Sequence, residues 1–235
     1  MRTPLKTASK LASAGGVLLD VDGTMYRQPP LRARMLLEIL KYTLRHPLQG
    51  SKMAYILREF RANRDSLRGA PTYKGFLEEI QYVQVAGKMK VPVTLIKEIV
   101  EEWIMTRPLR FLSTFRRPGI EVFLQRCRDH GMQIGAFSDY PTRRKVEALG
   151  LSPWFNLHLC STDPDINRFK PSPEGILLAC KTWKLVPEEL LYVGDQVKID
   201  GAAAEAAGSR FVLVGQSQDC RHFAVRDFFE LASHL

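Results

Sequence analysis

Short apolar runs that end in polar residues constrain the fold of this chain more than any other feature of its sequence. GGVLLD at 15–20 has the composition of a buried strand and ends in an acid. Similar runs follow further along the chain, namely MQIGAFSD, FNLHLCS, LLYVGD and RFVLVG, which begin at Met132, Phe155, Leu190 and Arg210. Helical patterns separate most of these later runs. Strands that alternate with helices predict a parallel sheet with helices on both faces, so we expect an α/β fold.

A long helical stretch lies between the first strand and the others. Helical periodicity runs from 30 to 68 with a break at HPLQG (46–50), and further helices are expected around 72–86 and 92–106. In the first helix, the apolar residues that fall largely on one face are Leu36, Ile39, Leu40 and Leu44. This block contains no strong strand pattern.

The pattern predicts two domains and a flexible start. An α/β core of residues 15–24 and 115–235 would carry an all-helical insertion of residues 25–114. The segment 1–14 is basic and rich in small residues, and it lacks the apolar centre of a signal peptide. We expect it to be flexible, and a targeting role for it stays open.

Composition indicates a soluble globular protein. Hydrophobic residues make up 45% of the 235 residues and charged residues 25%, and no apolar run approaches the ~18 residues of a membrane-spanning helix. The chain has four cysteines without a C-x-x-C pair, Cys127, Cys160, Cys180 and Cys220. Free thiols are typical of a reducing compartment, so we expect a cytoplasmic protein, either a monomer or a dimer.

The positive charge of the chain lies almost wholly in the helical insertion. The formal net charge is +9, and residues 25–115 hold 16 Lys and Arg against 8 Asp and Glu. Four arginines share one face of the predicted helix at 51–68, namely Arg58, Arg61, Arg64 and Arg68. This stripe is either a solvated face or a surface for an anionic substrate or an anionic membrane. Nucleic acid is not expected, because the insertion has no known binding motif.

Polar side chains follow three of the predicted strands. Asp20 and Asp22 follow the first, Ser138 and Asp139 end the second, and Asp195 follows LLYVG. Ligands of an open parallel sheet bind beyond the carboxyl ends of its strands, so these groups should meet in one crevice if the strands are neighbours. FKPSPEG adds a lysine, Lys170, just before a helix.

Clustered carboxylates stay ionised together only when a cation neutralises them, and oxygen ligands without a His or Cys cluster favour Mg²⁺. Asp20 and Asp195 are the natural ligands, while Lys170 and the Ser138 hydroxyl would hold phosphate oxygens. An ionised Asp20 needs no general base to attack phosphorus. Asp22 is then free to act as acid and later as base.

These residues resemble a known family. DVDGT at 20–24, the serine at 138, KP at 170–171 and GDQVKIDGAAAEAAG at 194–208 are similar, in order and spacing, to the four motifs of the haloacid dehalogenase (HAD) superfamily. The likeness extends to its subfamily I, whose members include phosphoglycolate phosphatase-like enzymes with a helical C1-type cap. It implies a Rossmann-like core, with residues 25–114 as the cap.

The resemblance also implies roles for single residues. Asp20 would be the nucleophile and Asp22 the general acid/base, and the Asp22 carbonyl with Asp195 would complete the Mg²⁺ ligands. Asp200 would orient Lys170 or a metal-bound water. The implied phosphate-binding set is Gly23, Thr24, Ser138, Asp139 and Lys170. Two residues depart from the usual pattern: Met25 stands where leucine is usual, and Asp139, where asparagine is common, adds a negative charge near the phosphate.

The sequence thus predicts a Mg²⁺-dependent phosphatase that forms a phosphoaspartate and acts on a small or lipid-linked phosphate monoester. The cap arginines are the candidates for substrate specificity. A phosphomutase is the alternative with the same aspartates. A dehalogenase needs neither Mg²⁺ nor Asp22, which argues against it, and a non-catalytic binding protein is disfavoured because every catalytic position is filled.

Overall fold

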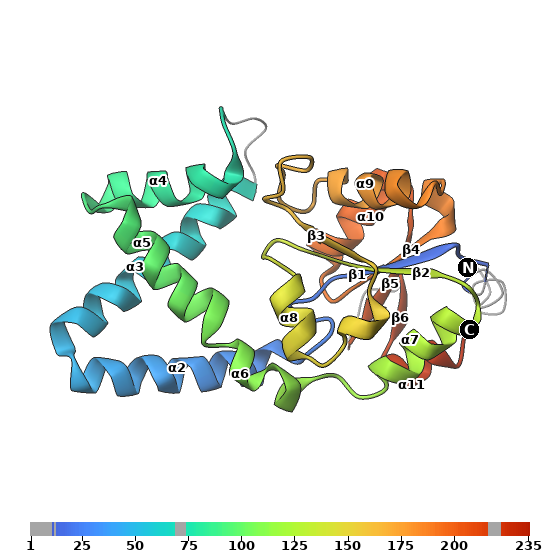
Figure 1. The fold of residues 1–235 in the computed structure, drawn as a ribbon, viewed down its shortest axis with the longest axis horizontal. Coiled ribbons are helices and arrows are strands. Elements are labelled where there is room, and N and C mark those ends of the chain that lie inside the picture. The colour runs from blue at the N-terminus through green and yellow to red at the C-terminus, as the bar shows by residue number, and fades with distance from the viewer. Residues whose placement is uncertain (1–10, 12, 69–73, 216–221) are drawn as a thin grey trace.

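A sheet of six parallel strands forms the centre of the computed structural model, which describes residues 11, 13–68, 74–215 and 222–235. The strand order is β3-β2-β1-β4-β5-β6, as in doubly wound dinucleotide-binding folds (Figure 1). The strands are β1 (Gly16–Leu19), β2 (Gln133–Ser138), β3 (Leu157–Cys160), β4 (Leu190–Gly194), β5 (Arg210–Val214) and β6 (Phe223–Val225). The predicted α/β fold is confirmed, and β6 is a strand that the sequence pattern did not reveal.

Strand β1 lies in the middle of the sheet because both of its faces are apolar. Val17 and Leu19 pack into one hydrophobic cluster, and Leu18 packs into a second cluster on the opposite face. The strand pairs with β2 on one side and with β4 on the other. The chain therefore reverses its direction of winding at β1.

Helices cover both faces of the sheet, as predicted. α9 (Glu174–Trp183) and α10 (Ala202–Ala207) lie on one face, and α7 (Ile120–Asp129) and α11 (Phe228–Ala232) lie on the other (Figure 1). α8 (Arg143–Ala148) follows β2. The core also contains two 3₁₀ turns and a π-helical turn, at Ser152–Trp154, Pro187–Glu189 and Val197–Gly201.

The helical block between β1 and α7 has a small core of its own. It comprises α2 (Gln28–Arg45), α3 (Pro47–Arg68), α4 (Leu77–Met89), α5 (Val93–Val100), a π-helix (Glu101–Thr106), α6 (Leu109–Leu112) and a 3₁₀ turn (Ser113–Phe115). Ile56, Phe60, Val85 and Ile96 pack together among these helices. Figure 1 shows α2 to α5 beside one end of the sheet.

The predicted helix break at HPLQG (46–50) is longer than the break in the structure. α3 begins at Pro47, so only His46 separates it from α2. Proline is tolerated in the first turn of a helix, where its missing N–H would have no partner in any case. The helix predicted around 72–86 begins at Leu77 instead and ends at Met89.

Two antiparallel segments connect the core to the helical block. Tyr26 and Arg116 form a β-bridge, and the Arg27 N–H donates to the Phe115 carbonyl at 2.9 Å. The Arg117 N–H donates to the Met25 carbonyl at 2.9 Å. We propose that these paired segments are the junction between two domains.

Four of the five leucines of α2 are exposed to solvent. Leu36, Leu40 and Leu44 are exposed, whereas Leu31 and Met35 are the buried residues of this helix. The periodicity is therefore real, but it places a second apolar face in contact with solvent.

The predicted flexible segment 1–14 falls mainly outside the described residues; of its described residues, Leu11 and Ala14 are buried in the core. Cys127, Cys160 and Cys180 are free and buried, and Cys220 lies outside the described residues. Among the described residues, no helix is both long enough and apolar enough to cross a membrane.

Candidate active site

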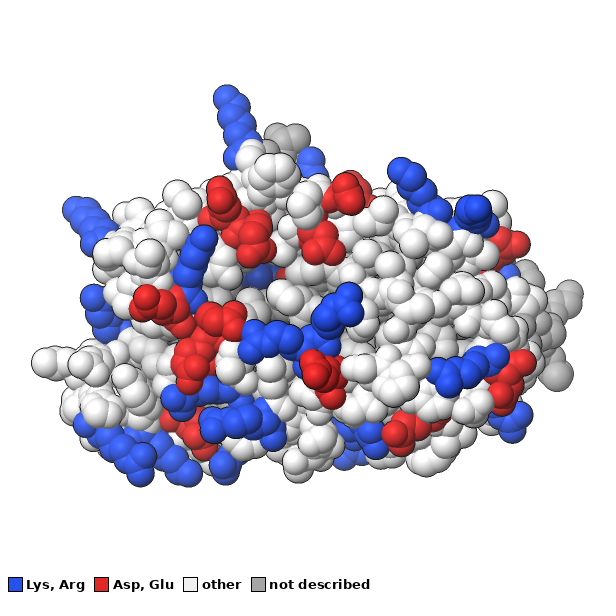
Figure 2. All heavy atoms as spheres, viewed as in Figure 1, with Lys and Arg blue, Asp and Glu red and all other residues white. Residues whose placement is uncertain are grey.

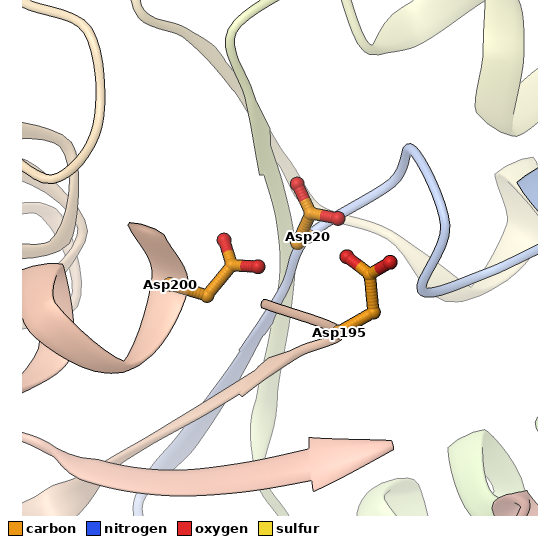
Figure 3. A group of neighbouring side chains, drawn as sticks. All are labelled: Asp20, Asp195 and Asp200. Carbon is orange, nitrogen blue, oxygen red and sulfur yellow. The ribbon is translucent and has the colours of Figure 1, made fainter. Parts of the chain in front are cut away.

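The polar ends of three neighbouring strands meet at one edge of the sheet. Asp20 follows β1, Ser138 ends β2 and Asp195 follows β4, and β1 lies between the other two. Asp200 belongs to the turn after β4. In Figure 3, the carboxylates of Asp20, Asp195 and Asp200 point toward one another from separate elements. Parallel pairing thus brings Asp20 beside two acids that lie about 175 residues further along the sequence.

Asp20 is a buried carboxylate held by two donors. The Lys170 ammonium donates to its Oδ1 at 2.5 Å, and the Thr24 hydroxyl donates to its Oδ2 at 2.8 Å. Burial raises the pKa of Asp20 well above its usual range, and the nearby acids raise it further, while Lys170 acts in the opposite direction. More positive charge is therefore needed to keep Asp20 ionised.

Lys170 bridges Asp20 and Asp200. Its ammonium lies 2.6 Å from Asp200 Oδ1 and 3.2 Å from the Tyr192 hydroxyl. Burial disfavours the charge of Lys170, but Asp20 and Asp200 keep its pKa well above the usual value. The Gln196 N–H donates to the other oxygen of Asp200 at 3.1 Å. Asp200 is therefore fixed as a partner of the lysine.

The acids at this edge fit a hard divalent cation. One oxygen from each of Asp20, Asp195 and Asp200 lies within 4.8 Å of the others. Asp195 Oδ1 is buried and has no hydrogen-bond partner, although it is a strong acceptor. A Cβ at Gly23 would stand 2.2 Å from Asp195 Oδ2, so only glycine lets the loop approach this carboxylate. An oxygen-only donor set with an unsatisfied carboxylate suits Mg²⁺.

Asp22 lies in a separate cluster of donors. The Lys145 ammonium is 2.6 Å from both carboxylate oxygens, the Tyr26 hydroxyl donates to Oδ1 at 2.5 Å, and the Ser138 hydroxyl donates to Oδ2 at 2.8 Å. Burial alone would raise the pKa of Asp22, but Lys145 and the two hydroxyls bring it below the usual value. Asp20 and Asp22 are thus adjacent carboxylates in opposite electrostatic environments.

Sequence reasoning missed several residues around these acids. Lys145 and Tyr26 hold Asp22, Tyr192 contacts Lys170, and the Arg117 guanidinium donates to the Gly23 carbonyl at 2.8 and 3.0 Å. The only signal for Lys145 was its place on the helix after β2. Arg143 and Arg144 precede it directly, so the sequence alone did not reveal which of these three basic side chains points toward the site.

The carboxylate of Asp139 contacts other protein groups through both of its oxygens. Its Oδ1 accepts hydrogen bonds from the Ser161 hydroxyl and the Lys170 N–H, and its Oδ2 pairs with Arg68 at 2.7 Å. Both oxygens are therefore occupied, and the added negative charge is met by an arginine of α3. The geometry favours a role in joining the helical block to the core.

The four arginines of the predicted stripe divide into two groups. Arg61, Arg64 and Arg68 line the cavity at the site, whereas Arg58 pairs with Glu59 and does not line it. Arg64 is 3% exposed and donates to Gln81 Oε1 and to the Asp139 carbonyl. Among the described residues, neither Arg61 nor Arg64 forms an ion pair. Arg61 is exposed and its charge is available to an anion, whereas the guanidinium of Arg64 already donates to two acceptors and lies over the ring of Tyr140.

A cavity of about 620 Å³ lies between the core and the helical block. Its polar floor contains Asp20, Asp22, Ser138, Lys145 and Lys170. Its opposite wall is largely apolar and is formed by Leu31, Met35, Ile39, Trp103, Ile104 and Leu109. The reactive groups thus face a chamber that has an anion-binding side and an apolar side.

Comparison with known proteins identifies the class to which this fold and site belong. Residues 15–208 match the model of the haloacid dehalogenase-like hydrolases, and the chain belongs to that family. Over 218 residues it is 26% identical to a phosphoglycolate phosphatase from Salmonella choleraesuis (strain SC-B67), covering 85% of this chain and 80% of the relative.

Solved structures share the fold. A HAD phosphatase from Thermococcus onnurineus has a TM-score of 0.64 at 21% identity, covering 93% of this chain and 96% of the other. A β-phosphoglucomutase from Clostridium difficile has a TM-score of 0.58 at 18% identity, covering 93% of each chain. At these identities the likeness concerns the fold alone.

Mg²⁺ should stabilise the protein through Asp195, and more strongly at neutral than at acidic pH. Burial, followed by Asp200, raises the pKa of Asp195 from 3.8 to about 6, so the metal-free fold loses stability as pH rises through that range. Above pH 6 the Asp195 carboxylate is already ionised, so Mg²⁺ binds to it without displacing a proton. Thermal denaturation with and without Mg²⁺ should show a larger rise in Tm at pH 7.5 than at pH 5, and Asp195→Asn should remove most of it. An equal rise in this variant would contradict the assignment.

Proposed function

We propose that this chain is a Mg²⁺-dependent phosphatase that hydrolyses phosphate monoesters through a phosphoaspartate at Asp20. One observation carries the proposal: a buried carboxylate, paired with Lys170 and close to Asp195, which has an unsatisfied oxygen, opens into a cavity lined by arginines. Family membership and relatives named as phosphatases support the same reaction.

In the first step, a carboxylate oxygen of Asp20 attacks phosphorus and the bond to the leaving oxygen breaks. The leaving oxygen takes a proton from Asp22. In the second step, water attacks the phosphorus of the acyl phosphate, Asp22 takes the proton of that water, and phosphate leaves Asp20. This division of roles needs a bound cation to keep Asp20 ionised, because burial raises its pKa, and it needs Asp22 to carry a proton although Lys145 lowers its pKa.

Asp20, Asp195 and the Asp22 carbonyl would hold Mg²⁺, with Asp200 close by or acting through water. The cation, when bound, would neutralise Asp20 and the phosphoryl oxygens. Lys170 supplies the permanent charge on the other side of the nucleophile. Asp200 and Tyr192 keep the lysine in place through contacts with its ammonium.

The phosphoryl group would be bound by Ser138, Lys170 and the loop at Gly23 and Thr24. Ser138 also donates to Asp22, so phosphate binding and the position of the acid are linked through one hydroxyl. Arg61 and Arg64 would attract the anion into the cavity. We do not assign Asp139 to the phosphate, because Arg68 and Ser161 already occupy its carboxylate.

The apolar wall favours a monoester with an apolar group. A cavity of about 620 Å³ is far larger than a phosphoryl group and is in the range of sites for drug-sized ligands. Leu31, Met35 and Trp103 offer hydrocarbon surface to an apolar group, while Arg32 and Arg61 line the same cavity and leave room for a second anionic group. We therefore propose that the leaving group is at least partly hydrocarbon, as in a lipid-linked phosphate.

Replacing Asp20 by Asn should abolish turnover while leaving the fold intact, because the amide is nearly isosteric but is not nucleophilic. Phosphate release from an aryl phosphate, with Mg²⁺ and with EDTA, measures the effect. We expect at least a thousandfold loss for the variant and loss of wild-type activity in EDTA. Full activity of the purified variant would refute the mechanism. Phosphorus NMR of the products separates a phosphatase from a phosphomutase.

Lys145 should set the pH dependence of the acid step. Replacing it by Met removes the charge that lowers the pKa of Asp22, so the protonated form should persist to higher pH. With an alkyl phosphate, whose leaving oxygen needs a proton, we expect the alkaline limb of kcat to move upward, so that activity persists to higher pH than in the wild type. An aryl phosphate should be less affected. The control is Arg143→Met on the same helix, which should match the wild type; an unshifted profile for the Lys145 variant would exclude this role.

A further inference from the structure

The outward face of α2 carries a continuous row of leucines. Leu36, Leu37, Leu40 and Leu44 are 50–73% exposed, and Leu48, just after the helix, is 89% exposed. We call these five residues the leucine ridge. The spacing of the four leucines in α2 places them side by side over about two helical turns, and Leu48 lies at the start of α3, two residues after the break at His46. Large exposed apolar patches on soluble proteins mark surfaces that bind something.

Basic side chains border the leucine ridge on both sides. Arg32 lies on one side of the helix, and Lys41 and Arg45 lie on the other; all three are exposed. Figure 2 shows Lys and Arg side chains along the edge of the molecule where α2 lies. Glu38 is the only acid of α2, and it already pairs with Arg34 at 3.1 Å. The face is thus apolar at its centre and positive at its margins.

We propose that the leucine ridge docks on the surface of an anionic lipid bilayer. A helix with an apolar face bordered by Lys and Arg lies in the interface of a membrane, with its leucines at the boundary of the acyl chains and its basic groups among the phosphates. Anionic lipids attract each such basic residue. The arginine stripe of α3 does not form this surface, because Arg64 and Arg68 are bonded to the core.

A second copy of the chain fits this face poorly. In a twofold dimer through α2, Arg32, Lys41 and Arg45 of both copies would meet across the interface. The helix offers no free carboxylate to pair with them, since Glu38 is occupied within its own chain. Like charges would therefore oppose the contact that the leucines favour, whereas an anionic bilayer satisfies both.

The leucine ridge adjoins the cavity of the site. Leu36 belongs to the ridge and also lines the cavity, together with Arg32. A bilayer at the ridge would therefore lie next to one wall of that cavity. Docking itself does not depend on the proposed phosphatase activity and is tested without it.

Sedimentation of the full chain with vesicles tests the proposal. At low salt, vesicles of phosphatidylcholine with phosphatidylserine should retain the protein, and vesicles of phosphatidylcholine alone should retain much less. The double variant Leu40→Ser/Leu44→Ser should lower the partition coefficient roughly tenfold or more. Lys41→Gln/Arg45→Gln should lower it about tenfold and weaken its salt dependence. Neither pair lines the cavity, so activity on a soluble aryl phosphate should stay unchanged.

The matched control is Leu177→Ser, which removes an exposed leucine from α9 of the core and should bind vesicles like the wild type. Two outcomes would overturn the proposal. One is failure of the wild type to bind anionic vesicles. The other is a dimer, seen by light scattering, that the Leu40→Ser/Leu44→Ser variant dissociates, which would assign the ridge to self-association.

Discussion

The ammonium of Lys170 between Asp20 and Asp200 is the interaction on which the rest of the site depends. Parallel pairing of β1 with β4 forces Asp20 and Asp195 together, and the turn after β4 adds Asp200. One lysine does not balance two buried acids and the half-buried Asp195, and the unpartnered oxygen of Asp195 shows where charge is lacking. The site is therefore built to hold further positive charge, and an anionic phosphoryl group becomes compatible with it once a cation is present.

The helical block is attached to this edge by its arginines. Arg68 pairs with Asp139 and donates to the Lys170 carbonyl at 2.8 Å, and Arg64 donates to the Asp139 carbonyl. The same helix that encloses the cavity thus contacts the loops that carry Lys170 and Ser138. The wall from α2 and its neighbours is largely apolar, and Gln28 and Arg32 are its polar members. Under the proposed function, two different helices would serve two needs, charge for the phosphate and hydrocarbon surface for the remainder of a substrate.

The sequence allowed the sheet and the acids to be predicted because their signals are local. Apolar runs that end in acid locate strands β1 and β4, and their shared edge follows from parallel pairing. Lys145 was missed because side-chain direction on a short helix depends on how that helix packs. The outward direction of Leu40 and Leu44 was missed for a related reason: periodicity defines a face but not the side on which the protein lies. Asp139 looked like a phosphate ligand until Arg68, distant in sequence, was placed beside it.

The most direct test of the mechanism is to find the phosphorylated residue itself. The protein is mixed with substrate and Mg²⁺, quenched in acid and reduced with borohydride, which converts an acyl phosphate of aspartate into homoserine. Peptide mass spectrometry then locates the change. The account predicts homoserine at position 20, and none when EDTA is present or substrate is omitted. Turnover with Asp20 unmodified, or with homoserine at another aspartate, would contradict it.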